Sequence, residues 1–379
     1  MQGHPRKVLQ IIDDATIGGG QRHVLWLSTG LRAHGWQVEV ACAADGWLVD
    51  ELRSQGIVHH GVEMSNRPSL STLGGIRGVL DRVDPAVVHT HGSTAGFYGR
   101  VAARLRRSQA VVHTYHGLHY LHEKAGARRA VFEFVDRALS RITDRVICVS
   151  DSDRRVTLGR GLASEGKTAV IKIGIDPGPF SEIPQRPMPS RPTIGTIGRL
   201  HPQKGHAHLI DAMKRLRDGG FPAELEIVGE GELRRSLTAQ IQESGLASAV
   251  RLLGAQTDAP AILSRFDVFV LPSLWEGLPY VLLEAMAAAR PIVASNVDGV
   301  AEAVADSEEG ILVRPGDPEA LADGLRRALD DPARAQSMGR KARERVWREF
   351  GVEGMIQKIS LLYEDALQSA RAREDVAAR

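Results

Sequence analysis

Two carboxylates stand eight positions apart in the otherwise apolar stretch EGLPYVLLEAMAAARP, residues 276–291. The run between Pro279 and Pro291 has no polar face, and a helix that is apolar all round is a buried helix. Glu284 is therefore expected to be buried, and a buried carboxylate needs hydrogen-bond donors from the protein or from a ligand. Glu276 lies at the helix entrance, beside free N–H groups and the positive dipole end. The two acids are either structural, as a salt-bridge partner and a first-turn acid, or they bind a polar ligand.

Two glycine-bounded loops also have residues suited to chemistry. ATIGGGQRH places Gly18, Gly19 and Gly20 at the start of a helix, which suits a sugar diphosphate, although a plain tight turn would use the same residues. GTIGRLHPQKGH contains Arg199 and Lys204, two cations that could clamp a diphosphate. Neither loop matches the dinucleotide fingerprint or the P-loop.

The elements that position these loops alternate regularly. Short β-branched runs such as KVLQIID and TIGTIG are separated by helical patterns, which is the signature of βαβ units on parallel sheets. The rhythm breaks at residues 177–192, which hold six prolines and indicate an interdomain linker. We therefore predict an α/β protein with two doubly wound domains, residues 1–182 and 183–350. Residues 333–370 are predicted to be continuously helical, and the helix over 351–379 to cross back to the first domain.

Composition limits the classes of protein that remain. The chain has 379 residues, 43% of them hydrophobic and 25% charged, which is typical of a soluble two-domain protein. Its two cysteines, Cys42 and Cys148, lie in strand-like runs and are expected to be buried thiols rather than a disulfide. No stretch has the length of a signal-peptide core or a membrane span, so a cytoplasmic protein is expected.

Several motifs together resemble a known family. GGGQRH, VSDSDRR, IGID, GRLHPQKG, IVGEGEL, VRLLG and the E-x₇-E block PSLWEGLPYVLLEAMAAARPIVAS resemble the retaining glycosyltransferases of family 4 over about residues 8–350. The chain departs from the family pattern at three positions. Ile173 stands where Asn is usual, Ala289 stands where Gly is usual, and Asp298 replaces the first glycine of a Gly-Gly-x-x-Glu region.

The resemblance implies the GT-B fold, with two Rossmann-like domains that face a central cleft, the first for the acceptor and the second for a nucleotide-sugar donor. It implies that Glu284 binds the ribose hydroxyls, that Glu276 contacts the donor sugar, and that Arg199 and Lys204 neutralise the leaving diphosphate. His116, in HTYHG, would approach the sugar from the acceptor side. The remaining residues expected to bind substrate are Gly18, Gly19, Gly20, Gly198, Gly229, Leu253, Gly277, Leu278 and Pro279.

Two further groups of residues invite other interpretations. The histidines His89, His91, His113, His116, His119 and His122 crowd two strand ends, but no carboxylate or cysteine is spaced with them as in a metal site, so neither a metal nor a cofactor is expected. Asp151-Ser152-Asp153 spells D-x-D, which a helix N-cap explains better than a cation site.

Residues 100–160 carry 13 Lys and Arg against 6 Asp and Glu. This excess is either a solvated helix face or a patch for a membrane surface or an anionic acceptor. Nucleic acid is not expected as a partner, because no aromatic platform or recognition module accompanies the charge.

The predicted function is retaining, metal-independent transfer of a sugar from a nucleotide-diphosphate donor to an acceptor, in the synthesis of cell-envelope polysaccharide, glycolipid or a related glycoconjugate. Three alternatives stay open. A nucleotide-sugar epimerase of GT-B architecture would isomerise the donor without an acceptor. A non-catalytic sugar-nucleotide binding protein would use Arg199 and Lys204 to bind the diphosphate but would not transfer the sugar. A glycosidase would also use two carboxylates.

Overall fold

The structure, a computed structural model, describes residues 6–64, 69–106, 110–118, 120–123 and 126–377. Its contacts divide the chain into two compact units. Unit 1 comprises Met1–Ile173 and Val352–Arg379, and unit 2 comprises Gly174–Gly351. The boundary expected after residue 182 therefore lies inside unit 2. Among the helices of the described residues, none has both the length and the hydropathy that a membrane span requires.

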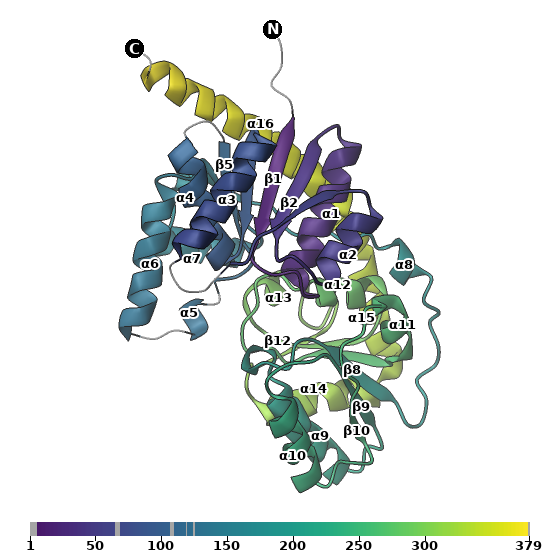
Figure 1. Ribbon diagram of the computed structural model, residues 1–379. Helices are drawn as coiled ribbons and strands as arrows, with labels where there is room; N and C mark the ends of the chain where they lie inside the picture. Colours follow the sequence, from purple (N-terminus) through teal and green to yellow (C-terminus); the bar gives the residue numbers. More distant parts are fainter. Residues whose placement is uncertain (1–5, 65–68, 107–109, 119, 124–125, 378–379) are drawn as a thin grey trace. The chain divides into compact units, whose positions relative to one another are not determined.

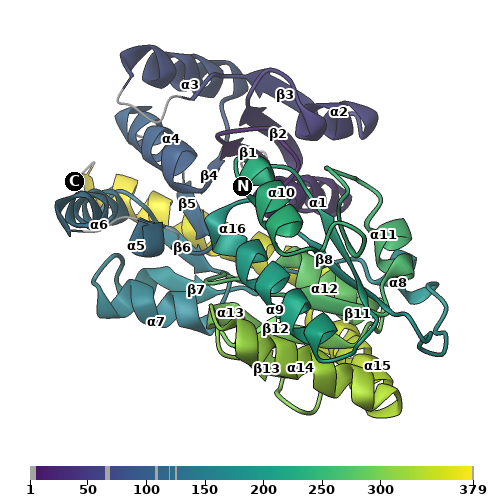
Figure 2. The ribbon, with the colours of Figure 1, turned by 90° about the horizontal axis from the view of Figure 1, so that it is seen from below.

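Unit 1 is built on a parallel sheet of seven strands in the order β3-β2-β1-β4-β5-β6-β7. Helices α3 and α4 cover one face of this sheet, and α1 and α2 cover the other (Figure 2). The strands are β1 Lys7–Ile12, β2 Gln37–Cys42, β3 Val58–Gly61, β4 Val87–His91, β5 Ala110–Tyr115, β6 Arg145–Cys148 and β7 Thr168–Val170. The helices are α1 Gly19–Ala33, α2 Trp47–Ser54, α3 Leu70–Val83, α4 Ser93–Arg106, α5 Tyr120–Glu123, α6 Gly126–Ser140, α7 Asp151–Gly159 and α16 Val352–Ala377, with a 3₁₀ turn at Glu165–Lys167.

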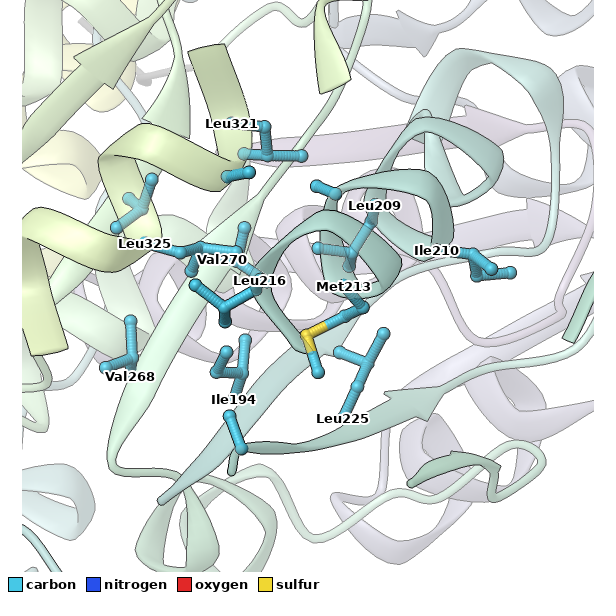
Figure 3. Close-up of a cluster of buried hydrophobic side chains, with 14 of the residues drawn as sticks. Ile194, Leu209, Ile210, Met213, Leu216, Leu225, Val268, Val270, Leu321 and Leu325 are labelled. Atoms are coloured by element: carbon cyan, nitrogen blue, oxygen red, sulfur yellow. The ribbon is translucent and has the colours of Figure 1, made fainter. Parts of the chain in front are cut away.

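Unit 2 is built on a parallel sheet of six strands in the order β10-β9-β8-β11-β12-β13. Side chains from α9 and α14 meet side chains from β8, β9 and β11 in its core, as Figure 3 shows. The strands are β8 Thr193–Ile197, β9 Glu224–Val228, β10 Val250–Leu252, β11 Val268–Leu271, β12 Ile292–Ser295 and β13 Ile311–Val313. The helices are α8 Gly178–Ser181, α9 His206–Asp218, α10 Arg234–Glu243, α11 Ala259–Arg265, α12 Tyr280–Ala287, α13 Asp298–Ala303, α14 Pro318–Asp330 and α15 Pro332–Glu349, with a 3₁₀ turn at Pro202–Lys204.

The proline-rich stretch 177–192 is not the linker that the sequence indicates. Its first residues form α8, and its later residues are bonded to the body of unit 2. Arg186 pairs with Asp267 at 3.0 Å, and the carbonyl of Pro184 accepts a hydrogen bond from Arg290 at 3.2 Å. Beyond α8 the stretch has no regular structure, but an irregular segment can still pack against its own domain.

The C-terminal helical region is two helices rather than one, because α15 ends at Glu349, with Phe350 as its C-cap, and α16 begins at Val352. Helix α16, yellow in Figure 1, packs against α1 and β5 of unit 1. Trp36 donates to the Ser360 hydroxyl over 2.9 Å, and the buried Tyr363 hydroxyl lies 2.6 Å from Nδ1 of His89. The last helix is therefore part of unit 1 in structure although it is far away in sequence.

Candidate active site

Most of the residues that the sequence predicts for the donor lie at one edge of the unit 2 sheet. Because all six strands are parallel, their carboxyl ends meet at the same edge, and the order of connections reverses beside β8, where such sheets bind ligands. Gly198 and Arg199 follow β8, Gly229 follows β9, Leu253 follows β10, and Glu276 follows β11. The topology thus brings together loops that are widely spaced along the chain.

The centre of this group is an ion pair between Lys204 and Glu276. The Nζ atom of Lys204 lies 2.5 Å from Oε1 of Glu276, and Glu276 is only 7% exposed. The buried Ser273 hydroxyl donates to the same Oε1 over 2.7 Å, and Gln203 Nε2 lies 3.4 Å from Oε2. The family resemblance assigns Glu276 to the donor sugar and Lys204 to the diphosphate. In this structure the two side chains bind each other.

The loops on either side hold Glu276 through its backbone. Its N–H donates to Oδ2 of Asp298 over 3.2 Å, and Asp298 is the first residue of α13. Gln203 also donates to the carbonyl of Trp275 over 3.0 Å, while its own carbonyl accepts from Leu274 N over 2.8 Å. Glu276 is consequently tied to the loop after β8 and to the loop after β12.

Two glycines allow the loops of this edge to approach so closely. At Gly229, with φ of 147°, a Cβ would lie 2.0 Å from the carbonyl oxygen of Gly198. At Gly299, a Cβ would lie 2.0 Å from the carbonyl oxygen of Gly277. Any side chain at either position would push apart backbones that line the candidate site.

Arg199 extends into solvent, while its carbonyl oxygen lies 3.3 Å from Nε2 of the buried His206. Within the ranges that the structure describes, the Arg199 guanidinium forms no ion pair. Burial, aided by the nearby Lys204 charge, lowers the pKa of His206 to about 4. The imidazole is therefore neutral at neutral pH and supports the Arg199 backbone without competing for an anion.

Helix α12 places the second acid as the sequence predicts. Glu284 is 1% exposed, and every other residue of α12 except the half-buried Val281 is buried. Pro279 is the N-cap rather than the first helical residue, so Gly277, Leu278 and Pro279 form a buried entrance loop ahead of Tyr280. The role of this loop towards a sugar or a diphosphate stays a prediction.

Two of the three departures from the family pattern lie at left-handed backbone. Ala289, which follows the C-cap of α12, has φ of 50°, and Asp298 has φ of 33°. Glycine adopts this region without penalty, whereas a Cβ makes it costly. The chain therefore tolerates strain at both positions, and at Asp298 the side chain gains the bond to Glu276.

The predicted residues of unit 1 gather around a group of histidines. His116 lies one residue after β5, and its ring is 4.7 Å from the ring of His23, which α1 positions behind Gly18, Gly19 and Gly20. His91 ends β4, and its Nδ1 lies 3.1 Å from Nε2 of His116. Burial lowers the pKa of both His23 and His91 far below the usual range.

The deeper histidines have structural partners. His89 lies between Tyr363 and the Thr114 hydroxyl at 2.7 Å, and His113 lies 2.8 Å from the Thr90 hydroxyl. His119 lies outside the described residues. Asp151-Ser152-Asp153, predicted to form a helix N-cap, does lie at the start of α7. The cap is Ser150, whose side chain accepts from Asp153 N, so Asp151 is the first helical residue and not the cap.

Sequence reasoning missed several residues that complete these groups. Ser273 and Gln203 flank predicted residues by one to three positions, and polar residues beside a predicted site are the signal that could have found them. His23 stands three positions after the glycine triplet. Together with Gln21 it is one of the two polar residues on the buried face of α1 that lie nearest to the triplet. Gln10, whose Oε1 lies 3.1 Å from Nε2 of His91, is a polar residue in the apolar run KVLQIID, and its position inside a buried strand is the signal that could have found it.

Both halves of the chain are similar to known protein families. The family model described as Glycosyltransferase Family 4 matches residues 17–178, and the model described as Glycosyl transferases group 1 matches residues 182–345. The UDP-Gal:alpha-D-GlcNAc-diphosphoundecaprenol alpha-1,3-galactosyltransferase of Escherichia coli is 31% identical over 291 residues, which cover 74% of this chain and 75% of that protein. The alpha-maltose-1-phosphate synthase of Mycolicibacterium smegmatis is 32% identical over 295 residues, which cover 70% and 75%.

Solved structures share the fold over nearly the whole chain. HepE of Anabaena in complex with UDP and glucose superposes with a TM-score of 0.84 at 21% identity, covering 95% of this chain and 99% of that one. Sucrose-phosphate synthase of Thermosynechococcus elongatus gives a TM-score of 0.80 at 24% identity, covering 96% and 99%. With both halves matched by the models and the fold shared end to end, the chain belongs to glycosyltransferase family 4 and has the GT-B fold.

Proposed function

We propose that this glycosyltransferase moves a sugar from a nucleotide-diphosphate sugar to an acceptor with retention of anomeric configuration and without a divalent metal. The observation that carries the proposal is the pair between half-buried Lys204 and buried Glu276 at the carboxyl edge of the unit 2 sheet. A neutral ion pair beside an exposed arginine offers a diphosphate two cations and offers a sugar hydroxyl one carboxylate.

In the proposed reaction the bond between the anomeric carbon and the diphosphate oxygen breaks, and the acceptor oxygen bonds to the same face of that carbon. The departing diphosphate oxygen takes the acceptor proton, so no strong protein base is needed. Lys204 and Arg199 would stabilise the charge that develops on the diphosphate, which is the kind of contact that accelerates a reaction because it strengthens in the transition state.

The remaining predicted residues would bind the donor and the acceptor. Glu284, on α12, would accept hydrogen bonds from the ribose hydroxyls, and Glu276 would accept one from the sugar ring. His116 of unit 1 would contact the sugar, beside the glycines at the start of α1. Because ribose contacts are similar in the ground and transition states, loss of the Glu284 carboxylate would affect donor affinity more than turnover.

The acceptor is proposed to be a lipid-linked or polysaccharide intermediate of the cell envelope. The Escherichia coli relative is named for a diphosphoundecaprenol acceptor, and a 24% identical relative from Staphylococcus aureus is named for capsular polysaccharide biosynthesis. An acceptor of this kind would require the protein to reach a membrane surface while the chain itself remains peripheral.

Helix α6 of unit 1 offers a surface for that contact. Arg128, Val131 and Phe134 follow one another at three-residue spacing along α6, and Val131 and Phe134 are 60% and 68% exposed. Exposed apolar side chains beside an arginine suit an anionic membrane surface. Among the 13 cations of residues 100–160, Arg106 instead pairs with Asp81 and Asp84, and Arg107 lies outside the described residues.

The function is tested first by thermal unfolding with a panel of nucleotide sugars, because a ligand at 100 times its Kd should add about 2.7 kcal/mol of stability. The stabilising donor is then incubated with EDTA and with lipid-linked or sugar acceptors, and the product is analysed for its anomeric configuration. Glu284→Gln should raise the KM for the donor, while Glu243→Gln, at an exposed acid of α10, should not.

Each alternative outcome has a different meaning. Isomerised donor without an acceptor would indicate an epimerase, and sugar released without any nucleotide donor would indicate a glycosidase. Donor binding with no transfer to any acceptor class would indicate a binding protein. Activity that EDTA abolishes and Mg²⁺ or Mn²⁺ restores would overturn the metal-independent mechanism.

A further inference from the structure

Three histidines of unit 1, His23, His91 and His116, form a cluster that we call the histidine triad. One ring nitrogen from each lies within 4.8 Å of the others. The three side chains come from different elements: α1, the end of β4 and the loop after β5. Unlike His89 and His113, which are enclosed by hydroxyl groups, the triad includes a ring that is only half-buried, that of His116.

The hydrogen bonds around His91 determine which of its nitrogens carries the proton. Gln10 donates through Nε2 to the Ser28 hydroxyl over 2.7 Å, so its Oε1 faces Nε2 of His91 at 3.1 Å. An amide oxygen can only accept, and His91 must therefore be protonated at Nε2. Its Nδ1 is left with a lone pair directed towards His116 Nε2, at 3.1 Å.

This arrangement is the one that histidine ligands of zinc adopt. In such sites the non-ligating ring nitrogen usually donates to a carbonyl or carboxylate oxygen, which holds the ring and its tautomer. Tetrahedral zinc with bonds of about 2.0–2.1 Å places neighbouring ligand nitrogens roughly 3.3 Å apart. The His91–His116 separation of 3.1 Å is already close to this value. The three nitrogens lie within 4.8 Å of one another, so the third ring would need to approach by at most about 1.5 Å.

We propose that the histidine triad binds Zn²⁺, with Gln10 orienting His91, and that bound zinc withdraws His116 from the sugar and so inhibits transfer. The inhibitory part rests on the proposed function; the binding part does not. Without zinc, the His116 Nε2–H donates to Nδ1 of His91. On binding, that proton moves to Nδ1 of His116, so the imidazole stays neutral, its Nε2 lone pair binds the ion, and no redox change occurs.

The triad suits zinc better than magnesium, because three imidazoles without a carboxylate are borderline-soft ligands, whereas Mg²⁺ requires oxygen. Three protein ligands also leave a fourth position for water or a ligand oxygen, as in open zinc sites. The half-buried His116 provides the side from which the ion reaches the cluster.

The test measures zinc binding directly, by competition with a chromophoric zinc indicator, on chelator-treated protein without any sugar nucleotide. We expect one Zn²⁺ per chain and no competition from Mg²⁺. Gln10→Leu should weaken binding by about 10 to 100-fold, as changes beside metal ligands do. His116→Gln and His91→Gln should weaken it further, and His122→Gln, at an exposed histidine of the same unit, should leave it unchanged.

His91 is fully buried, so a melting curve must establish that His91→Gln folds. If it does not fold, His116→Gln still decides the test, because His116 is only half-buried. Binding that persists in both triad variants, or no stoichiometric binding in the parent protein, overturns the inference. Zinc binding by a protein that transfers no sugar would support the site and refute the proposed function. Sugar transfer that is insensitive to zinc, by a protein that binds no zinc, would support the proposed function and refute the zinc site.

Discussion

Asp298 Oδ2 accepts the backbone N–H of Glu276 over 3.2 Å, and Asp298 reaches this position with a left-handed φ of 33°. The residue stands where the family usually has glycine, which would adopt this φ without strain. The chain instead has a carboxylate here, beside Glu276, which is proposed to hold the donor sugar. Strain of this kind persists only where the surrounding structure compensates for it, and it is common at functional sites.

Asp298→Gly should therefore weaken binding of the nucleotide sugar by about tenfold, which is the scale of a hydrogen bond to a charged group, and leave binding of the free nucleotide unchanged. Asp298→Asn is the matched control, because it keeps an acceptor oxygen and tolerates left-handed backbone. Calorimetric titration of both ligands measures the difference. Equal losses for nucleotide and nucleotide sugar would show that Asp298 supports the fold of the unit and not the sugar position.

The Lys204–Glu276 pair is expected to contribute to both stability and turnover. Lys204→Ala leaves a buried carboxylate without its cation, so it should destabilise unit 2 by about 3 kcal/mol and lower turnover by roughly 10² to 10³ at saturating donor. Lys204→Ala with Glu276→Gln should recover much of the stability, because the uncompensated charge is gone, but not the turnover. Urea unfolding and initial rates on the same samples separate the two effects. Turnover that returns with stability would remove Lys204 from the chemistry.

Ala289 and Ala288 provide a matched pair for the cost of left-handed backbone. Both are fully buried, but Ala289 has φ of 50° and Ala288 has φ of −73°. Glycine at either position loses a buried methyl group and gains unfolded-state entropy, whereas only Ala289→Gly also relieves a penalty of about 1–2 kcal/mol. Ala288→Gly should accordingly destabilise the protein by about 1–2 kcal/mol more than Ala289→Gly in urea unfolding. Equal destabilisation would mean that Ala289 is not strained.

Buried His206 should make unit 2 less stable in mild acid. Its pKa is about 4 in the folded protein against 6.5 for a free imidazole, so between these values the unfolded chain binds the extra proton. The free energy of unfolding then falls as pH falls, and the contribution of His206 should drop by about 2 kcal/mol between pH 7 and pH 5.

His206→Gln keeps a donor near the Arg199 carbonyl but does not titrate. Its free energy of unfolding should therefore depend less steeply on pH over the same interval. The other buried histidines are present in both proteins, so their contribution to the pH dependence cancels in the comparison. Parallel pH dependences for the variant and the parent would contradict the assignment of this effect to His206.

The apolar stripe of α6 should bind anionic membranes. Val131→Ser with Phe134→Ser should reduce sedimentation with phosphatidylglycerol vesicles at all salt concentrations, because the lost contact is apolar. Arg128→Gln should reduce it mainly at low ionic strength, where unscreened charge contributes most. Leu361→Ser is the control, since Leu361 of α16 is 66% exposed and outside the stripe. Loss of binding in that variant too, or no binding by the parent protein, would exclude α6 as the membrane contact.

Local sequence patterns were sufficient for the α/β class, for the burial of Glu284 and for most strands of the two sheets, because periodicity and β-branched runs report directly on which residues are buried. The short edge strand β3 has no such signal, since VHHG has neither an apolar run nor a clear alternation. The strand-like run TIGTIG was predicted just ahead of Gly198 and Arg199, which follow β8 in the structure. Gly229 and Leu253 were named through the family resemblance, and they follow β9 and β10.

Contacts between segments that are far apart in the chain were decided only by the tertiary structure. The sequence assigned Lys204 and Glu276 to different parts of a ligand, and only the neighbouring positions of β8 and β11 pair them with each other. The bond from Asp298 to Glu276 and the convergence of His23, His91 and His116 likewise depend on strand order and on the packing of α1. Periodicity specifies which face of an element is buried, but which elements meet is set by sheet topology, and that information is not local.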